Sequence, residues 1–417
     1  MQTRQLRLVL SLLLTLCVCS ATQAQPTGRI ESMKLLTPDV GWAATSKKLF
    51  WTTNGGAQWK DITPKADHKG QAVSSVFFLD TSTGWVLLKC GDDRDVLADE
   101  GCFALASTTD AGETWSVLQE KIKVPFSREY LEDSTGFSGQ SWLQFIDSQH
   151  GWELLDIATN SANPSAGEML RTSDGGRTWT PTKGTPTSDH FLFITPTNGW
   201  IAGGNDQELF VTRDAGDSWQ KVSLPIAAGT QPNLGESISL PVFLKSEKQG
   251  FLSVHYSVGP VAGPYLTTLV LFGTGDGGRT WKQDRVLPRL PGVFISETAD
   301  SSWIAVHSEL LKSQKTRVQV YTEGRDGKVA ENVALVSSLG AATELSFLRQ
   351  SEGWLDMSDK LLATKDSGNT WADITPGSTQ QRHSVHNISI PGHRSFCDLF
   401  IFGERLRGGC GQLLRSL

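Results

Sequence analysis

The sequence predicts an all-β fold, a seven-bladed β-propeller built from four-stranded antiparallel sheets. Two offset repeats, and the absence of sustained helical periodicity after the first residues, support this prediction. The first repeat is a turn sequence, (Ser/Thr)-x-(Asp/Asn)-x-Gly-x-(Thr/Ser)-Trp, in which Gln58 replaces the hydroxyl residue of the first copy. Its six copies are centred on Asn54, Asp110, Asp174, Asp214, Asp276 and Asp366.

The second repeat is Gly-Trp or a near equivalent. It occurs seven times, at steps of 43, 67, 48, 51, 52 and 51 residues. The copies are Gly41-Trp42, Gly84-Trp85, Gly151-Trp152, Gly199-Trp200, Gly250-Phe251, Ser302-Trp303 and Gly353-Trp354. In the sixth unit Asp326 stands where a decayed turn repeat is expected. Seven units of this length predict seven blades, which form one domain over residues 25–376.

Each part of the turn repeat has a structural explanation. The Asp or Asn is expected to accept hydrogen bonds from backbone N–H groups two residues on, and the Gly supplies a positive φ. The Thr or Ser suits the start of a strand, and the Trp buries a large apolar surface between neighbouring sheets. The six acidic or amide positions are therefore interpreted as structural. In the last unit the pattern predicts strands at residues 344–349, 353–357, 360–364 and 371–374.

Residues 1–24 have the features of a signal peptide. Arg4 and Arg7 precede an apolar run, Leu8–Val18, which is short for a membrane span, and Thr22-Gln23-Ala24 suits signal peptidase. A lipoprotein reading of Cys17 and Cys19 is disfavoured because no small residue precedes either one. The sequence therefore predicts a periplasmic or secreted protein.

Four cysteines remain after the signal peptide, and an even number in an exported chain favours disulfides. We expect local pairs, Cys90–Cys102 and Cys397–Cys410, the second within a C-terminal extension at residues 377–417 that packs on the propeller. The alternative, a metal site formed with His383, His386 and His393, lacks metal-ligand spacing, so no metal is expected. No cofactor motif is present in the sequence.

The charge of the chain argues against nucleic acid as a partner. The net charge is −6, or −8 without the two arginines of the signal peptide, and there is no basic tract.

Spacing within the units predicts where binding takes place. From each second-strand aromatic to the turn Asp or Asn the distance is 12, 25, 22, 14, 25, 23 and 12 residues, which predicts longer loops in blades 2, 3, 5 and 6. These loops and the links between blades are expected on one side of the ring, here called the loop side. The repeated turns lie on the other, the turn side. Loops on a rigid scaffold often carry function. The predicted binding residues are Asp92, Asp93, Arg94, Asp95, Arg128, Glu129, Tyr130, Asp133, Tyr256 and Tyr265.

The turn repeat is the Asp-box, or BNR repeat, which sialidases also carry. Their Arg-Ile-Pro signature fails here, because Glu31 follows Arg29-Ile30. A glycosidase of another family needs two carboxylates roughly 5 to 9.5 Å apart, for which Glu129 or Asp133 with Asp92 or Asp95 are candidates. No Ser-His-Asp, HExxH or P-loop motif is present, and no enzyme is predicted.

Both repeats together, with inner hairpins such as Val76–Trp85 and Phe191–Trp200, resemble the photosystem II assembly factor propellers and their non-photosynthetic bacterial relatives. The resemblance implies an exported, non-catalytic scaffold that binds a protein partner in the cell envelope and assists assembly of an envelope or membrane complex. The arginine-rich patch of photosynthetic members is missing. The alternative is a carbohydrate-binding or sialidase-like glycosidase propeller.

Overall fold

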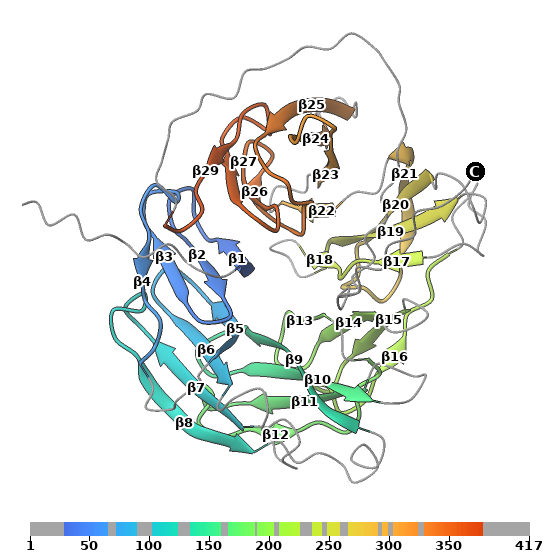
Figure 1. Ribbon diagram of the computed structural model, residues 1–417. Coiled ribbons are helices and arrows are strands. Elements are labelled where there is room, and N and C mark those ends of the chain that lie inside the picture. The colour runs from blue at the N-terminus through green and yellow to red at the C-terminus, as the bar shows by residue number, and fades with distance from the viewer. Residues whose placement is uncertain are drawn as a thin grey trace, which may run out of the picture.

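Seven antiparallel sheets stand around a common centre in the computed structural model, which confirms the predicted propeller (Figure 1). The structure describes residues 29–65, 72–89, 102–123, 134–159, 166–187, 190–203, 208–225, 236–243, 248–258, 266–290, 294–298, 303–323 and 329–377. Within these ranges every regular element is a strand.

The blades follow one another along the chain, each from an inner to an outer strand. Blade 1 contains β1 (Ile30–Leu35), β2 (Gly41–Thr45), β3 (Leu49–Thr52) and β4 (Lys60–Asp61). Blade 2 contains β5 (Ala72–Phe78), β6 (Gly84–Lys89), β7 (Cys102–Thr108) and β8 (Ser116–Lys123). Blade 3 contains β9 (Ser134–Phe145), β10 (Gly151–Thr159), β11 (Ala166–Thr172) and β12 (Thr180–Pro181). Blade 4 contains β13 (Phe191–Phe193), β14 (Gly199–Gly203), β15 (Glu208–Thr212) and β16 (Gln220–Lys221).

The inner edge of blade 5 is split into two short strands. This blade contains β17 (Glu236–Ile238), β18 (Val242–Phe243), β19 (Gly250–Val258), β20 (Leu266–Thr274) and β21 (Lys282–Leu290). Blade 6 contains β22 (Phe294–Glu297), β23 (Trp303–Leu310), β24 (Thr316–Glu323) and β25 (Val329–Val336). Blade 7 contains β26 (Glu344–Arg349), β27 (Glu352–Asp356), β28 (Leu361–Thr364) and β29 (Ala372–Asp373), close to the bounds predicted from sequence.

The glycine of the Gly-Trp repeat is required by an aromatic ring that lies across it. A Cβ atom added to Gly353 would lie 2.3 Å from the ring of Phe347, and one added to Gly151 would lie 2.6 Å from Phe145. The tryptophan that follows the glycine then packs on the next blade, since Trp152 stacks on Phe193 with ring centroids 3.8 Å apart. One repeat thus serves packing both within a blade and between blades.

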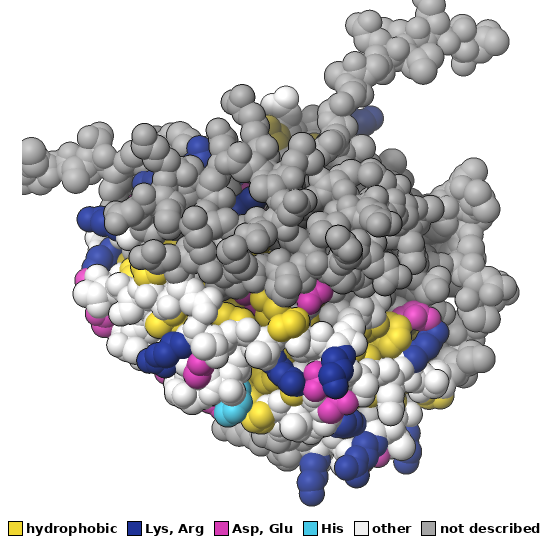
Figure 2. All heavy atoms as spheres, turned by 90° about the horizontal axis from the view of Figure 1, so that it is seen from below, with side chains coloured by type: hydrophobic (Ala, Val, Ile, Leu, Met, Phe, Trp, Pro, Cys, Tyr) yellow, Lys and Arg dark blue, Asp and Glu magenta, His cyan; other side chains and the backbone are white. Residues whose placement is uncertain are grey.

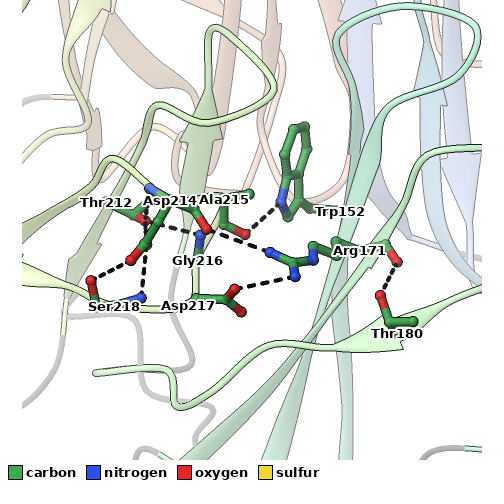
Figure 3. Close-up of polar contacts among 9 residues, drawn as sticks. All are labelled: Trp152, Arg171, Thr180, Thr212, Asp214, Ala215, Gly216, Asp217 and Ser218. Atoms are coloured by element: carbon green, nitrogen blue, oxygen red, sulfur yellow. Dashed lines mark hydrogen bonds and ion pairs between the residues drawn. The ribbon is translucent and has the colours of Figure 1, made fainter.

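The repeated turns share one hydrogen-bond pattern, shown for blade 4 in Figure 3. The Thr212 hydroxyl accepts from the Gly216 amide at 2.9 Å and donates to Asp214, whose carboxylate also accepts from the Ser218 amide at 2.8 Å. The Asp214 carboxylate therefore accepts from the amide four residues later in the chain, not two residues later as predicted. The turn is also tied to the preceding blade, because the Trp152 indole donates to the Ala215 carbonyl at 3.3 Å.

In the described part of the chain, side chains join blade 7 to blade 1, and no strand is exchanged between these two sheets. The Leu35 amide donates to the Ser346 hydroxyl at 3.0 Å, and the Trp59 indole donates to the Ile374 carbonyl at 2.5 Å. Trp59 also meets Trp354 edge to face at 5.6 Å. This junction, called the seam below, is where the ring closes.

Part of the sequence length assigned to long loops lengthens strands instead. The second and third strands have 8 residues each in blade 6 and 9 each in blade 5, against 5 and 4 in blade 1. In blade 6 only residues 311–315 connect β23 to β24, so the predicted long loop is absent there.

Candidate active site

Most of the residues predicted to bind a partner lie outside the described residues, namely Asp92, Asp93, Arg94, Asp95, Arg128, Glu129, Tyr130, Asp133 and Tyr265. The predicted disulfides also lie outside them, apart from the backbone of Cys102 in β7. Tyr256 is described, and its side chain is only 6% exposed in the apolar cluster that joins blades 4 and 5. Its ring therefore stabilises the core and offers little surface to a ligand.

A pair of carboxyl groups that the sequence analysis missed lies at the seam. Glu344 begins the inner strand β26, and Asp356 ends β27 directly opposite it. Residues paired in this way have Cβ atoms roughly 4.5–5.5 Å apart, so the two side chains are close neighbours. The turn between these strands contacts the repeated turn of blade 7, because the Ser367 amide donates to the Ser351 carbonyl. Glu344 and Asp356 stand at the opposite strand ends, toward the loop side.

The two acids differ in their access to solvent. Asp356 is 4% exposed, accepts a hydrogen bond from the Thr343 hydroxyl, and has no partner for Oδ1 among the described residues. Glu344 keeps part of its side chain exposed, and its carboxyl group accepts from the Met33 amide across the seam. Glu344 is therefore the less buried member of the pair.

The surroundings of Glu344 favour its protonated form. Desolvation, and next the neighbouring Asp356 carboxyl, raise the pKa of Glu344 to about 8. The pKa of Asp356 is raised as well, chiefly by burial and against the opposing effect of the Thr343 hydrogen bond. A carboxyl group that holds its proton at neutral pH has the protonation state that a general acid needs.

Two cationic side chains complete this site. Arg29 lies near enough to lower the pKa of Asp356. Lys34 projects from β1 over the ring of Phe77, 5.6 Å from its centroid, and is attracted to Glu344. Although the Lys34 side chain is exposed, desolvation by the surrounding inner strands lowers its pKa. Each cation acts on one acid, Arg29 on Asp356 and Lys34 on Glu344.

Blade 3 carries two further acids with a raised pKa. Glu153 is fully buried, and burial raises its pKa to about 8, while desolvation raises the pKa of the partly exposed Glu168 to about 7. Glu153 is opposite Leu143 and Leu170, which belong to the apolar cluster between blades 2 and 3. Because no surface of Glu153 is exposed, its carboxyl group affects the stability of blade 3 and does not contact a ligand.

The described residues hold no group of three or more His, Cys, Asp or Glu side chains arranged to bind a metal. No helix in this part of the chain combines the length and apolar character needed to cross a bilayer. Figure 2 shows the described edge of the ring, where basic and acidic side chains alternate without forming a field of one sign.

Comparison with known proteins gives no match to a family model. Two curated relatives are both named xyloglucanase. The protein from Hypocrea jecorina is 24% identical over 246 residues, which cover 55% of this chain and 25% of the relative. The protein from a Paenibacillus species is 27% identical over 192 residues, which cover 42% of this chain and 18% of the relative. The chain thus matches a quarter or less of the length of these relatives.

Among solved structures, one described as YCF48 bound to D1 peptide is 13% identical, with a TM-score of 0.48. The match covers 82% of this chain and 93% of that one.

The two xyloglucanases correct the predicted function. The sequence analysis expected a non-catalytic scaffold for a protein partner, and both curated relatives are instead named for a glycosidase activity. The prediction that the chain is no enzyme is wrong for the same reason. The turn and Gly-Trp repeats specify how blades pack and contain no information on the ligand, which is why they predicted the propeller correctly and the function wrongly. The comparison favours the alternative, a carbohydrate-active propeller.

Proposed function

We propose that this chain is a propeller module of a carbohydrate-active enzyme that binds and cleaves a β-linked glucan such as xyloglucan. The observation that carries the proposal is the match to two xyloglucanases from different organisms, over 55% and 42% of this chain. We assign the repeated turns to the Asp-box type, which specifies the propeller scaffold and not its ligand. A signal peptide at residues 1–24 would deliver the module to its polysaccharide outside the cytoplasm.

Glu344 is the proposed proton donor. Glycoside cleavage needs a carboxylic acid that protonates the leaving oxygen, together with a second carboxylate that activates water or attacks the sugar. Glu344 has the raised pKa and the partial exposure that the first role requires. Asp356 is too buried to touch a sugar, so its role is to position Glu344 and to keep it protonated.

The second carboxylate is proposed to come from the acids predicted on the loop side, Asp92, Asp95, Glu129 or Asp133. Each of these four acids is replaced separately, Asp by Asn and Glu by Gln. The second carboxylate is the residue whose replacement abolishes turnover while glycan binding persists.

The proposal is tested by incubating the purified chain, residues 25–417, with xyloglucan, mixed-linkage β-glucan, arabinan and a sialylated glycan. Product chromatography is expected to show cleavage of a β-glucan and no release of sialic acid. Retention in affinity electrophoresis gives an independent measure of binding. Failure to bind or cleave any of the β-glucans would refute the proposal.

A further inference from the structure

Trp142 is a tryptophan that the two sequence repeats do not explain. Twelve of the fourteen tryptophans belong to the repeats, which leaves Trp51 and Trp142. Trp51 is 5% exposed and packs on Phe78 at 4.6 Å, so it belongs to the core. Trp142 is only partly buried, and it packs in part against the apolar cluster that joins blades 3 and 4. It belongs to β9, which Figure 1 shows as the inner strand of blade 3. Core packing accounts for the buried part of its ring and leaves the exposed part for another role.

Trp142 has an aromatic neighbour that is also open to solvent. His190 precedes the inner strand β13 of blade 4, its side chain is exposed, and its ring centroid lies 5.3 Å from that of Trp142. The two rings are inclined at 57°, so they do not stack face to face and cover each other only in part. Together they present an apolar face beside a group that donates and accepts hydrogen bonds.

The strands that carry this pair are held rigidly together. Gln144, two residues along the same face of β9, accepts from the Phe193 amide at 2.7 Å and donates to the Phe193 carbonyl at 2.9 Å. On the other side of Trp142, the Ser141 hydroxyl is 2.7 Å from that of Ser74 in blade 2. The position of Trp142 is thus fixed before any ligand arrives, which lowers the entropic cost of binding.

We propose that Trp142 and His190 form a sugar-binding subsite for a neutral pyranose of a β-linked glucan. A β-glucopyranose has equatorial hydroxyls and a flat C–H face, which packs on the indole, while the imidazole hydrogen-bonds a hydroxyl at the ring edge. The binding step involves no covalent change. This inference rests on the proposed function. It adds a surface that positions the glucan at blades 3 and 4. The carboxyl pair lies elsewhere, at the seam between blades 7 and 1.

The test measures affinity for xyloglucan and cello-oligosaccharides by isothermal titration calorimetry. Trp142→Ala is expected to weaken binding at least tenfold, about 1.4 kcal/mol, whereas Trp142→Phe, which keeps an aromatic face, weakens it less. His190→Ala is expected to reduce affinity by a smaller factor. The matched control is Trp115→Phe. Trp115 is also partly buried, but it belongs to the repeated turn of blade 2, and its indole donates to the carbonyl of Ile62, which follows β4 of blade 1.

Thermal melting of each variant identifies any loss of affinity that comes from unfolding. If the wild-type chain binds a glucan and folded Trp142→Ala binds it equally well, the subsite is refuted and the proposed function stands. Equal losses in Trp142→Ala and Trp142→Phe would refute stacking as the mode of contact. If the wild-type chain binds none of these glucans, both proposals fail.

Discussion

Glu153 makes the stability of blade 3 depend on pH in a direction that the structure fixes. Its side chain is fully buried, and neither carboxyl oxygen has a hydrogen-bond partner among the described residues. Ionisation at this position would leave a charge in apolar surroundings with no counter-ion among the described side chains, so burial raises the pKa from 4.5 to about 8. We predict that Glu153→Gln removes this pH dependence.

The sign follows from proton counting. Between pH 4.5 and about 8 the folded chain holds a proton on Glu153 that the unfolded chain has released, so stability falls as pH rises through this range. The stabilisation by protonated Glu153 is fully present below pH 4.5, the pKa of the group in the unfolded chain. It is lost as the pH rises through about 8, the pKa in the folded chain. One pKa unit corresponds to about 1.4 kcal/mol, so the whole effect is at most on the order of 5 kcal/mol. A buried Gln also lacks partners, but that cost is the same at every pH.

The assay is urea unfolding of wild type and Glu153→Gln at several pH values from about 5 to 8, since the difference between them cancels the other titrating groups. The variant is expected to gain about 1 kcal/mol per pH unit relative to wild type. Glu113→Gln, at an exposed position paired with Lys60, is the matched control and should give a nearly flat difference. A flat difference for Glu153→Gln as well would refute the reasoning.

Three further predictions concern the fold. Gly353→Ala should destabilise by about 1–3 kcal/mol, because the new Cβ would overlap the Phe347 ring. Gly273→Ala should be nearly neutral, because no atom of the described residues lies within 4 Å of the new Cβ, and equal melting temperatures of the two variants would contradict the packing argument. Asp174→Ala should cost about 1–2 kcal/mol in denaturant unfolding, because the Thr178 amide and hydroxyl lose their acceptor, and it should leave glycan affinity unchanged; lost affinity at unchanged stability would assign the turn a binding role. Thiol labelling of exported, unreduced protein should find no free cysteine, and two reactive thiols would refute the pairs Cys90–Cys102 and Cys397–Cys410.

The ring itself was predictable because its signals are local and recur. The Gly-Trp and turn repeats specify one hairpin each, and their spacing gives the number of blades. The sequence also contains the reason for the glycine, since Phe78, Phe145, Phe193 and Phe347 each stand six residues before it. A six-residue spacing of this kind is the sequence signal for the ring-over-glycine contact found in the structure.

The carboxyl pair at the seam was harder to predict. Glu344 and Asp356 are twelve residues apart, and the predicted hairpin already placed them on facing strand ends. Their raised pKa, however, depends on the packing of blade 1, whose Met33 amide reaches Glu344 from a position about three hundred residues earlier. Contacts of that range follow from ring closure, which the repeats imply but do not describe in atomic detail.

The proposed role of Glu344 as the general acid of glucan cleavage is tested most directly by the release of reducing ends from xyloglucan. The wild-type chain is expected to release them, and Glu344→Gln, which keeps the shape and loses the proton, is expected to slow release by about a hundredfold or more. Comparable rates for the two proteins would contradict the role of Glu344. No release by the wild type, from xyloglucan or any other β-glucan, would contradict the account as a whole.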